Sequence, residues 1–170
     1  MVKALLCALL PLWLGGCSFS STPKAGDLSV SASASWPYAA PVHYALDEQY
    51  QFASDEVEAW FEPVLSAVGS ELQRKGWQPA TVHDANLVVA VGMLGPKDQD
   101  DALMAERLHI SVPKRAEDDG VLALVLLDPH LNRVVWRATL ALQPEGEVDD
   151  ATRQQLSQTW IARMLATLPR

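Results

Sequence analysis

The chain has 170 residues, of which 49% are apolar and 20% are charged, and its 21 acidic and 13 basic side chains give a formal net charge of −8. This composition is typical of one globular domain and excludes wholesale disorder and collagen-like repeats. The acidic balance argues against a nucleic-acid partner, because such a partner requires clustered Lys and Arg.

The first seventeen residues predict a bacterial lipoprotein signal. Lys3 supplies a positive charge, and the apolar run 4–14 would form about 16 Å of helix, too short for a bilayer core of about 30 Å. Residues 14–17, Leu-Gly-Gly-Cys, resemble the lipobox, in which the cysteine thiol receives a diacylglycerol and the peptide is cut just before it. We therefore expect a signal peptide at 1–16 and lipidation at Cys17. The alternative is an ordinary signal peptide with an incidental cysteine.

Lipidation would leave the mature chain without a free thiol, because Cys7 lies in the removed segment. A disulfide, a thiolate nucleophile and a cysteine-based metal site are then excluded. Acyl chains, palmitate among them, give stable anchoring when more than one is attached. Ser18 follows the cysteine, which resembles lipoproteins destined for the outer membrane of Gram-negative bacteria. In such a source we expect the domain at the periplasmic face of the outer membrane.

The residues after the lipobox predict a tether and then a first strand. Residues 17–27 are rich in Ser, Pro and Gly and are expected to form a flexible tether behind the lipidated cysteine. A single domain is then expected over 28–170. Apolar residues alternate with serines over 28–35, which is typical of a half-buried strand.

An aromatic-rich stretch follows at 36–52. We expect it to be an irregular segment packed on the domain core. Alternatively, it offers a candidate ligand-contact surface made of Trp36, Tyr38 and Tyr44.

The next element is predicted as a helix over 54–75. Apolar residues recur there at spacings of three and four, Ser54 is placed to cap the start, and Gly76 fits the position after the last turn. Pro63 lacks a backbone donor, so we expect a kink or a restart near Trp60.

Two strands are predicted after this helix. Residues 86–94 are apolar on both faces and β-branched at several positions. The apolar positions of 103–112 share one parity and predict another strand, although 104–107 would suit a helix equally well.

The last third of the chain predicts a hairpin and a helix. The segments 121–127 and 133–142 flank a turn that contains Pro and Asn. A final helix should begin at Asp149 or Asp150 and end near 168. These elements together predict the α+β class, with an antiparallel sheet of about four to five strands and two helices packed on one face.

The chain resembles domain-of-unknown-function family 4136, a family of bacterial lipoproteins. The likeness spans about residues 28–168, and that family has no established activity to carry over. It is carried by a Tyr-Ala step, by a helix that ends in Leu-x-x-Lys-Gly-aromatic, by an Asp-x-Asp-Leu strand and by a hairpin whose second arm reads Val-Trp-Arg-Gly. The matching pieces are Tyr44-Ala45, Leu72 to Trp77, Asp84 to Val89, and Asp128 with Val134 to Ala138.

The sequence contains no arrangement that points to catalysis or to a metal. The four histidines, His43, His83, His109 and His130, do not form the paired spacing of a helical zinc site. The acidic run 98–101 fails as a calcium loop, because Gly and Glu are absent from its sixth and twelfth positions. A nucleophile elbow, a P-loop and a dinucleotide fingerprint are also absent.

We therefore expect a protein that is not an enzyme and needs no cofactor. Its expected role is that of a lipid-anchored periplasmic accessory or interaction module, with the membrane and an envelope protein of unknown identity as partners. The alternative is a small-ligand or lipid-binding accessory of an envelope transport system, with 36–52 as a wall of the pocket.

Overall fold

The computed structural model of the chain describes residues 24–33, 35–110, 119–143 and 147–168. The predicted signal peptide, Cys17 and most of the predicted tether lie outside these residues. Among the residues that are described, no helix is both long and apolar enough to cross a bilayer. The elements, in chain order, are β1 (Lys24–Ala32), β2 (His43–Ala53), η1 (Asp55–Val57), α1 (Glu58–Arg74), β3 (Gln78–Pro79), β4 (Leu87–Leu94), α2 (Asp101–Leu108), β5 (Gly120–Asp128), β6 (Arg133–Gln143) and α3 (Asp150–Leu165).

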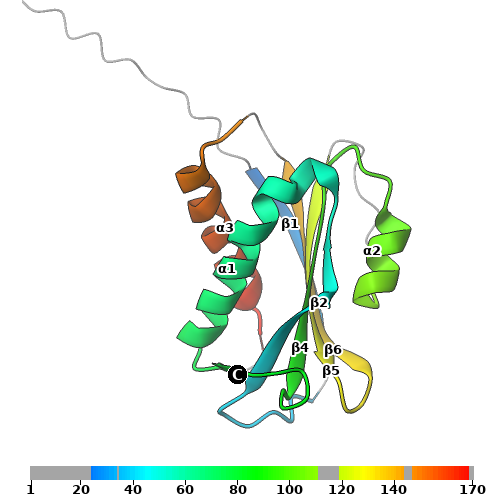
Figure 1. Cartoon of the computed structure of the whole chain (residues 1–170), viewed down its shortest axis with the longest axis vertical. Helices are drawn as coiled ribbons and strands as arrows, with labels where there is room; N and C mark the ends of the chain where they lie inside the picture. The colour runs from blue at the N-terminus through cyan, green and yellow to red at the C-terminus, as the bar shows by residue number, and fades with distance from the viewer. Residues whose placement is uncertain (1–23, 34, 111–118, 144–146, 169–170) are drawn as a thin grey trace, which may run out of the picture.

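One six-stranded sheet, with strand order β1-β6-β5-β4-β2-β3, separates two layers of helix. Helices α1 and α3 cover one face, and α2 lies on the other (Figure 1). The neighbouring strands β1, β6, β5 and β4 pair antiparallel, whereas β2 pairs parallel with both β4 and β3. Parallel strands require a crossover connection, and α1 supplies it between β2 and β4.

The α+β class is confirmed, but three details of the predicted architecture are wrong. Within the described residues the sheet is mixed rather than antiparallel, it has six strands rather than four or five, and three helices cover both of its faces. In addition, β1 begins at Lys24, so residues 24–27 belong to the sheet rather than to the tether.

The strand β2 occupies much of 36–52, the segment that was expected to be irregular. Its register against β4 shifts between Leu46 and Gln51. Before this bulge Tyr44 and Leu46 pack in the core beneath α1 and α3, and after it Tyr50 and Phe52 pack on the α2 side. The bulge therefore reverses the face on which even-numbered residues lie, and it erases the period-two pattern that marks a strand.

The predicted strand 103–112 is also wrong, since α2 occupies 101–108 and residues 111–118 lie outside the description. Met104 and Leu108 are both fully buried, and their spacing of four places them on one side of a helix. They pack against Gly92 of β4, where an added Cβ would lie 2.8 Å from each side chain. The close approach of α2 thus depends on a glycine that lies on another strand.

The predicted hairpin and the predicted strand at 86–94 are confirmed by β5, β6 and β4. Every residue of β4 and β5 is buried, which agrees with strands that are covered on both faces. Trp136 of β6 is fully buried in the cluster beneath α1 and α3. The indole ring therefore belongs to the core of the domain.

The helix starts follow the sequence only in part. Asp149 caps α3 as expected, because its carboxylate accepts a 2.7 Å hydrogen bond from the backbone N–H of Thr152. Ser54 makes no such cap, and its hydroxyl donates to Asp98 instead. The interruption that was expected near Trp60 lies three residues earlier, where η1 ends at Val57 and α1 begins.

Different helix ends and chain segments lie at the two ends of the sheet. One end holds the start of β1, which pairs with the end of β6, and helices α1, α2 and α3 also begin there (Figure 1). Acidic residues occupy the first turns of these helices, where the N-terminal end of the helix dipole favours them. The opposite end holds the β5–β6 turn and the C-terminal ends of α1 and α3.

Candidate functional site

A groove of about 560 Å³ lies between the C-terminal ends of α1 and α3 and the segment that joins β1 to β2. We call it the aromatic groove. Its walls carry three aromatic rings, three charged side chains and, at the C-terminal end of α3 and its cap, two alanines. They are Trp36, Tyr38, Trp77, Glu71, Arg74, Lys75, Ala162 and Ala166.

The aromatic rings of the groove form one contiguous group. The ring centroids of Trp36 and Tyr38 lie 5.0 Å apart in an edge-to-face arrangement, and those of Trp36 and Trp77 lie 6.1 Å apart in a stack. All three rings are half-buried, so each keeps part of its surface available. Such pairs stabilise by about 0.5–1.5 kcal/mol beyond the area they bury, which favours a preformed aromatic wall.

The structure brings together the three residues of the predicted ligand-contact surface, but only two of them line the groove. Trp36 and Tyr38 are on its wall. Tyr44 is only 2% exposed and lies behind Trp77, with ring centroids 6.4 Å apart. The Tyr44 hydroxyl donates to the backbone carbonyl of Gly69, so this residue fixes α1 and supports the wall from beneath.

Trp77 is a groove residue that the sequence analysis did not single out. Its place is set by how α1 ends. The N–H groups of Gly76 and Trp77 donate to the carbonyls of Gln73 and Leu72, which is the Schellman motif, and Gly76 has φ of 85°. This turn projects Trp77 beside the charged last turn of α1. The signal in the sequence is an aromatic residue directly after a basic pair and a capping glycine.

The charged side chains of the groove come from the last turn of α1. Arg74 donates two hydrogen bonds to Glu71, at 2.8 and 2.5 Å, and this bidentate contact holds the pKa of the Glu71 carboxyl below its ordinary value. Within the described residues, the Lys75 ammonium has neither a hydrogen-bond nor an ion-pair partner. Its charge nevertheless helps to lower the pKa of the Glu71 carboxyl, so the groove holds one carboxylate and two cations and carries a net positive charge in a chain whose net charge is −8.

A second contact fixes the other wall of the groove to the sheet. The Tyr38 hydroxyl donates a 2.6 Å hydrogen bond to the buried carboxylate of Asp128, which also accepts from the backbone N–H groups of His130 and Leu131. Burial raises the pKa of Asp128, but these three hydrogen bonds outweigh it and leave the pKa below its usual range. Burial and the contact with Asp128 raise the pKa of Tyr38, so its hydroxyl remains a donor.

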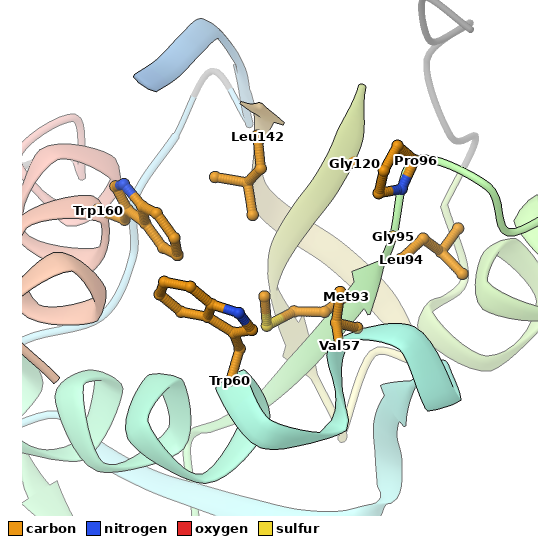
Figure 2. Close-up of a pocket in the computed structure, with 9 residues that line it drawn as sticks. All are labelled: Val57, Trp60, Met93, Leu94, Gly95, Pro96, Gly120, Leu142 and Trp160. Atoms are coloured by element: carbon orange, nitrogen blue, oxygen red, sulfur yellow. The ribbon is translucent and has the colours of Figure 1, made fainter. Parts of the chain in front are cut away.

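A smaller cavity of about 20 Å³ lies at the other end of the fold, and Figure 2 shows its apolar lining. Trp60 and Trp160 stack there with ring centroids 5.0 Å apart, and the guanidinium carbon of Arg153 lies 5.6 Å from the Trp60 ring centroid. A space of this size could hold about one water, and its apolar walls give that water too few partners. The stacked tryptophans therefore join α1 to α3, and the small space beside them is not a ligand site.

The remaining candidates from the sequence are separate in space. In the part of the chain that the structure describes, no three His, Cys, Asp or Glu side chains are grouped so that they could hold a metal ion. Asp98 accepts hydrogen bonds from the hydroxyl of Ser54 and from the N–H of Gly95, so it orders the loop after β4. His130 belongs to the turn that Asp128 caps, and His43 contacts Gln78 at the edge of the sheet.

No family model and no curated protein matches the chain. Solved structures resemble its fold at low sequence identity. A PDZ domain protein from Parabacteroides distasonis is 9% identical with a TM-score of 0.54, and the match covers 88% of this chain and 37% of that one. A PelC dodecamer from Paraburkholderia phytofirmans is 14% identical over 85% of this chain and 100% of that chain, with a TM-score of 0.49.

Protein XCC0632 from Xanthomonas campestris, of family DUF330, is 13% identical with a TM-score of 0.43, and the match covers 85% of this chain and 93% of that chain. At such identities a likeness concerns the fold alone. The candidate site therefore stands on the geometry of the aromatic groove.

Proposed function

We propose that this chain is a non-enzymatic accessory module of the bacterial envelope that is anchored through a lipid on Cys17 and binds its partner in the aromatic groove. In a Gram-negative source, its place is the periplasmic face of the outer membrane. The observation that carries the proposal is the position of the groove, at the end of the sheet opposite the start of β1.

The position of β1 supports a separation between the proposed anchor and the groove. Residues 18–23 join Cys17 to β1, and six residues span at most about 20–22 Å when fully extended. The nine residues of β1 then run for about 30 Å toward the end of the sheet where Trp36 and Tyr38 lie. A lipid on Cys17 would hold one end of the domain near the membrane, and the groove would be presented away from it.

We also propose that the chain belongs to family 4136. Two of the motifs that carry this resemblance lie at joints of the fold. Gly76 and Trp77 end α1 and build the groove, and Asp128 caps the β5–β6 turn while it accepts from Tyr38. Residues with such roles are expected to recur wherever the same fold is built.

The anchor is tested by Cys17→Ser, expressed in a Gram-negative host that is fed labelled palmitate. The unaltered chain should incorporate the label and sediment with the membranes, whereas the variant should do neither. Cys7→Ser is the matched control, because it removes a thiol from the signal segment and should leave both results unchanged. Membrane fractionation of Cys17→Ser equal to that of the unaltered chain, or an unacylated N-terminus by intact mass, would refute the anchor.

The aromatic groove also favours a second candidate, a small-ligand or lipid-binding accessory of an envelope transport system. Both candidates use the same surface but differ in what occupies it. In-cell crosslinking followed by mass spectrometry would find an envelope protein in the first case. Native mass spectrometry of protein extracted from its own envelope would find a bound small molecule in the second.

A further inference from the structure

We propose that the aromatic groove binds a small anionic amphiphile, whose apolar or ring-bearing body lies on Trp36 and Trp77 and whose carboxylate, phosphate or sulfonate is held by Lys75. This inference rests on the proposed function only in taking the groove as the binding surface. It does not depend on the lipid anchor.

The size and shape of the groove fit a small molecule. Its volume of about 560 Å³ lies within the range of about 300–1,000 Å³ that is typical of ligand sites. Its walls come from three separate elements that are fixed by packing, by the end of α1 and by the contact between Tyr38 and Asp128. A preformed site loses little conformational entropy when it binds a ligand.

The rings supply the apolar half of the recognition. Trp36 and Trp77 stack on one another and remain half-buried, so a ligand would complete the burial of both rings. The α3 wall at this point is made of small residues, including Ala166, which leave space in front of the rings. An apolar or flat body of a ligand fits this space.

The charged side chains of the groove determine which polar group of a ligand it would bind. Arg74 is satisfied by Glu71 through two hydrogen bonds, and the two charges cancel. Lys75 follows directly, lines the same groove and makes no hydrogen bond or ion pair among the described residues, so Glu71, Arg74 and Lys75 together leave one net positive charge. One net positive charge beside stacked rings is complementary to a ligand with one anionic group, and it gives no advantage to a neutral or cationic ligand.

A membrane surface and the N-terminal segment after Cys17 fit the groove less well. Aromatic residues that dock on a bilayer insert into it from the surface, whereas Trp36 and Trp77 form the wall of a hollow. Residues 18–23 attach at the opposite end of β1, and their full extension is shorter than the length of the sheet.

The inference is tested with two fluorescent probes that share their rings, the anion anilinonaphthalene sulfonate and neutral phenylnaphthylamine. The protein is the full chain with Cys17→Ser, in buffer without detergent, and circular dichroism verifies that each variant is folded. The sulfonate should bind at one saturable site, at least about tenfold more tightly than the neutral probe. Equal affinity for the two probes would overturn the anionic class while it left binding in the groove intact.

Variants then assign the probe to the groove. Lys75→Gln should weaken the sulfonate about tenfold and leave the neutral probe unchanged, whereas Trp36→Ala should weaken both. Lys97→Gln, at the other end of the fold, is the matched control and should change neither. If all groove variants bind the sulfonate as the unaltered groove does, the site lies elsewhere and the inference is wrong.

Two further measurements keep the test decisive. Ala166→Glu places a carboxylate on the exposed residue that caps α3 and should weaken binding of the sulfonate more than its neutral counterpart Ala166→Gln does, even if Trp36→Ala does not fold. The groove residues should not bind the protein to vesicles of phosphatidylglycerol, so the groove variants should not change how much protein sediments with such vesicles. Vesicle binding that is lost in Lys75→Gln would overturn the small-molecule assignment in favour of a membrane-docking surface.

Discussion

Replacement of Trp136 by Ala tests whether the core beneath α1 and α3 is packed as the structure shows. Trp136 is fully buried on β6, where it pairs with Leu126 on one side and with Ala32 on the other. Its indole N–H is buried without a hydrogen-bond partner among the described residues. The side chain therefore contributes a large apolar surface and also carries one unsatisfied donor.

The expected cost follows from these two features. A buried Trp removes about 150–250 Å² from water, which corresponds to about 4–6 kcal/mol at about 25 cal/mol per Å². The unsatisfied N–H offsets about 1–3 kcal/mol of this gain, and the cavity left by Ala adds to the loss. We expect the free energy of unfolding to fall by about 3–5 kcal/mol. Trp136→Phe, which keeps a ring and removes the donor, should cost only about 1–2 kcal/mol.

The assay is urea unfolding of the chain with Cys17→Ser, followed by far-ultraviolet circular dichroism. With a slope of about 1–3 kcal/mol per M, the midpoint for Trp136→Ala should fall by at least about 1 M. A loss below about 0.5 kcal/mol would refute the packing of this residue. A loss for Trp136→Phe equal to that for Trp136→Ala would refute the argument from the unsatisfied donor.

Three further predictions concern single joints of the fold. The pKa of Asp128 is lower in the folded than in the unfolded chain, so its carboxylate stabilises above a pH of about 4 and that contribution is lost as the pH falls through the folded-state pKa. Asp128→Asn should lower Tm at a pH of about 7, and this difference should shrink as the pH falls below about 4, whereas parallel Tm curves would contradict this. Gly76→Ala should cost about 1–2 kcal/mol in urea unfolding, because φ is 85° although space is available, and an unchanged midpoint would exclude the strain. Gly92→Ala should lower the free energy of unfolding by about 1–3 kcal/mol, because it forces α2 away from β4. The double variant Gly92→Ala with Met104→Ala should lose less than the sum of the two single losses, and an additive loss would disprove the clash.

The pairing of β2 shows where reasoning from sequence stops. The strand was not predicted because its bulge reverses the face of alternate residues, and its neighbour β4 lies more than thirty residues later in the chain. The helix α2 was predicted as a strand because Met104 and Leu108 satisfy both periods. The choice between them was made by the space above Gly92, which belongs to another element.

Only two aromatic residues of the candidate site were predicted from the sequence. Trp36 and Tyr38 lie close together in the chain, so their clustering was visible in the sequence. Trp77 and Lys75 join them only because the Schellman turn at the end of α1 returns the chain to the start of β2, where Gln78 pairs with His43. The Asp128 carboxylate, ninety residues from Tyr38, could not be assigned to the same wall from the sequence.

The sequence by itself determined β4, the β5–β6 hairpin, the cap of α3, the glycine that ends α1 and the α+β class. These features depend on hydrophobic periods and on contacts between residues a few positions apart, which a linear pattern records directly. Tertiary structure alone decided the parallel pairing of β2, the helical state of α2 and the position of Lys75 in the same groove as the stacked tryptophans. Each of these depends on which distant segments meet, and that is set by the free energy of packing the whole sheet between its helices.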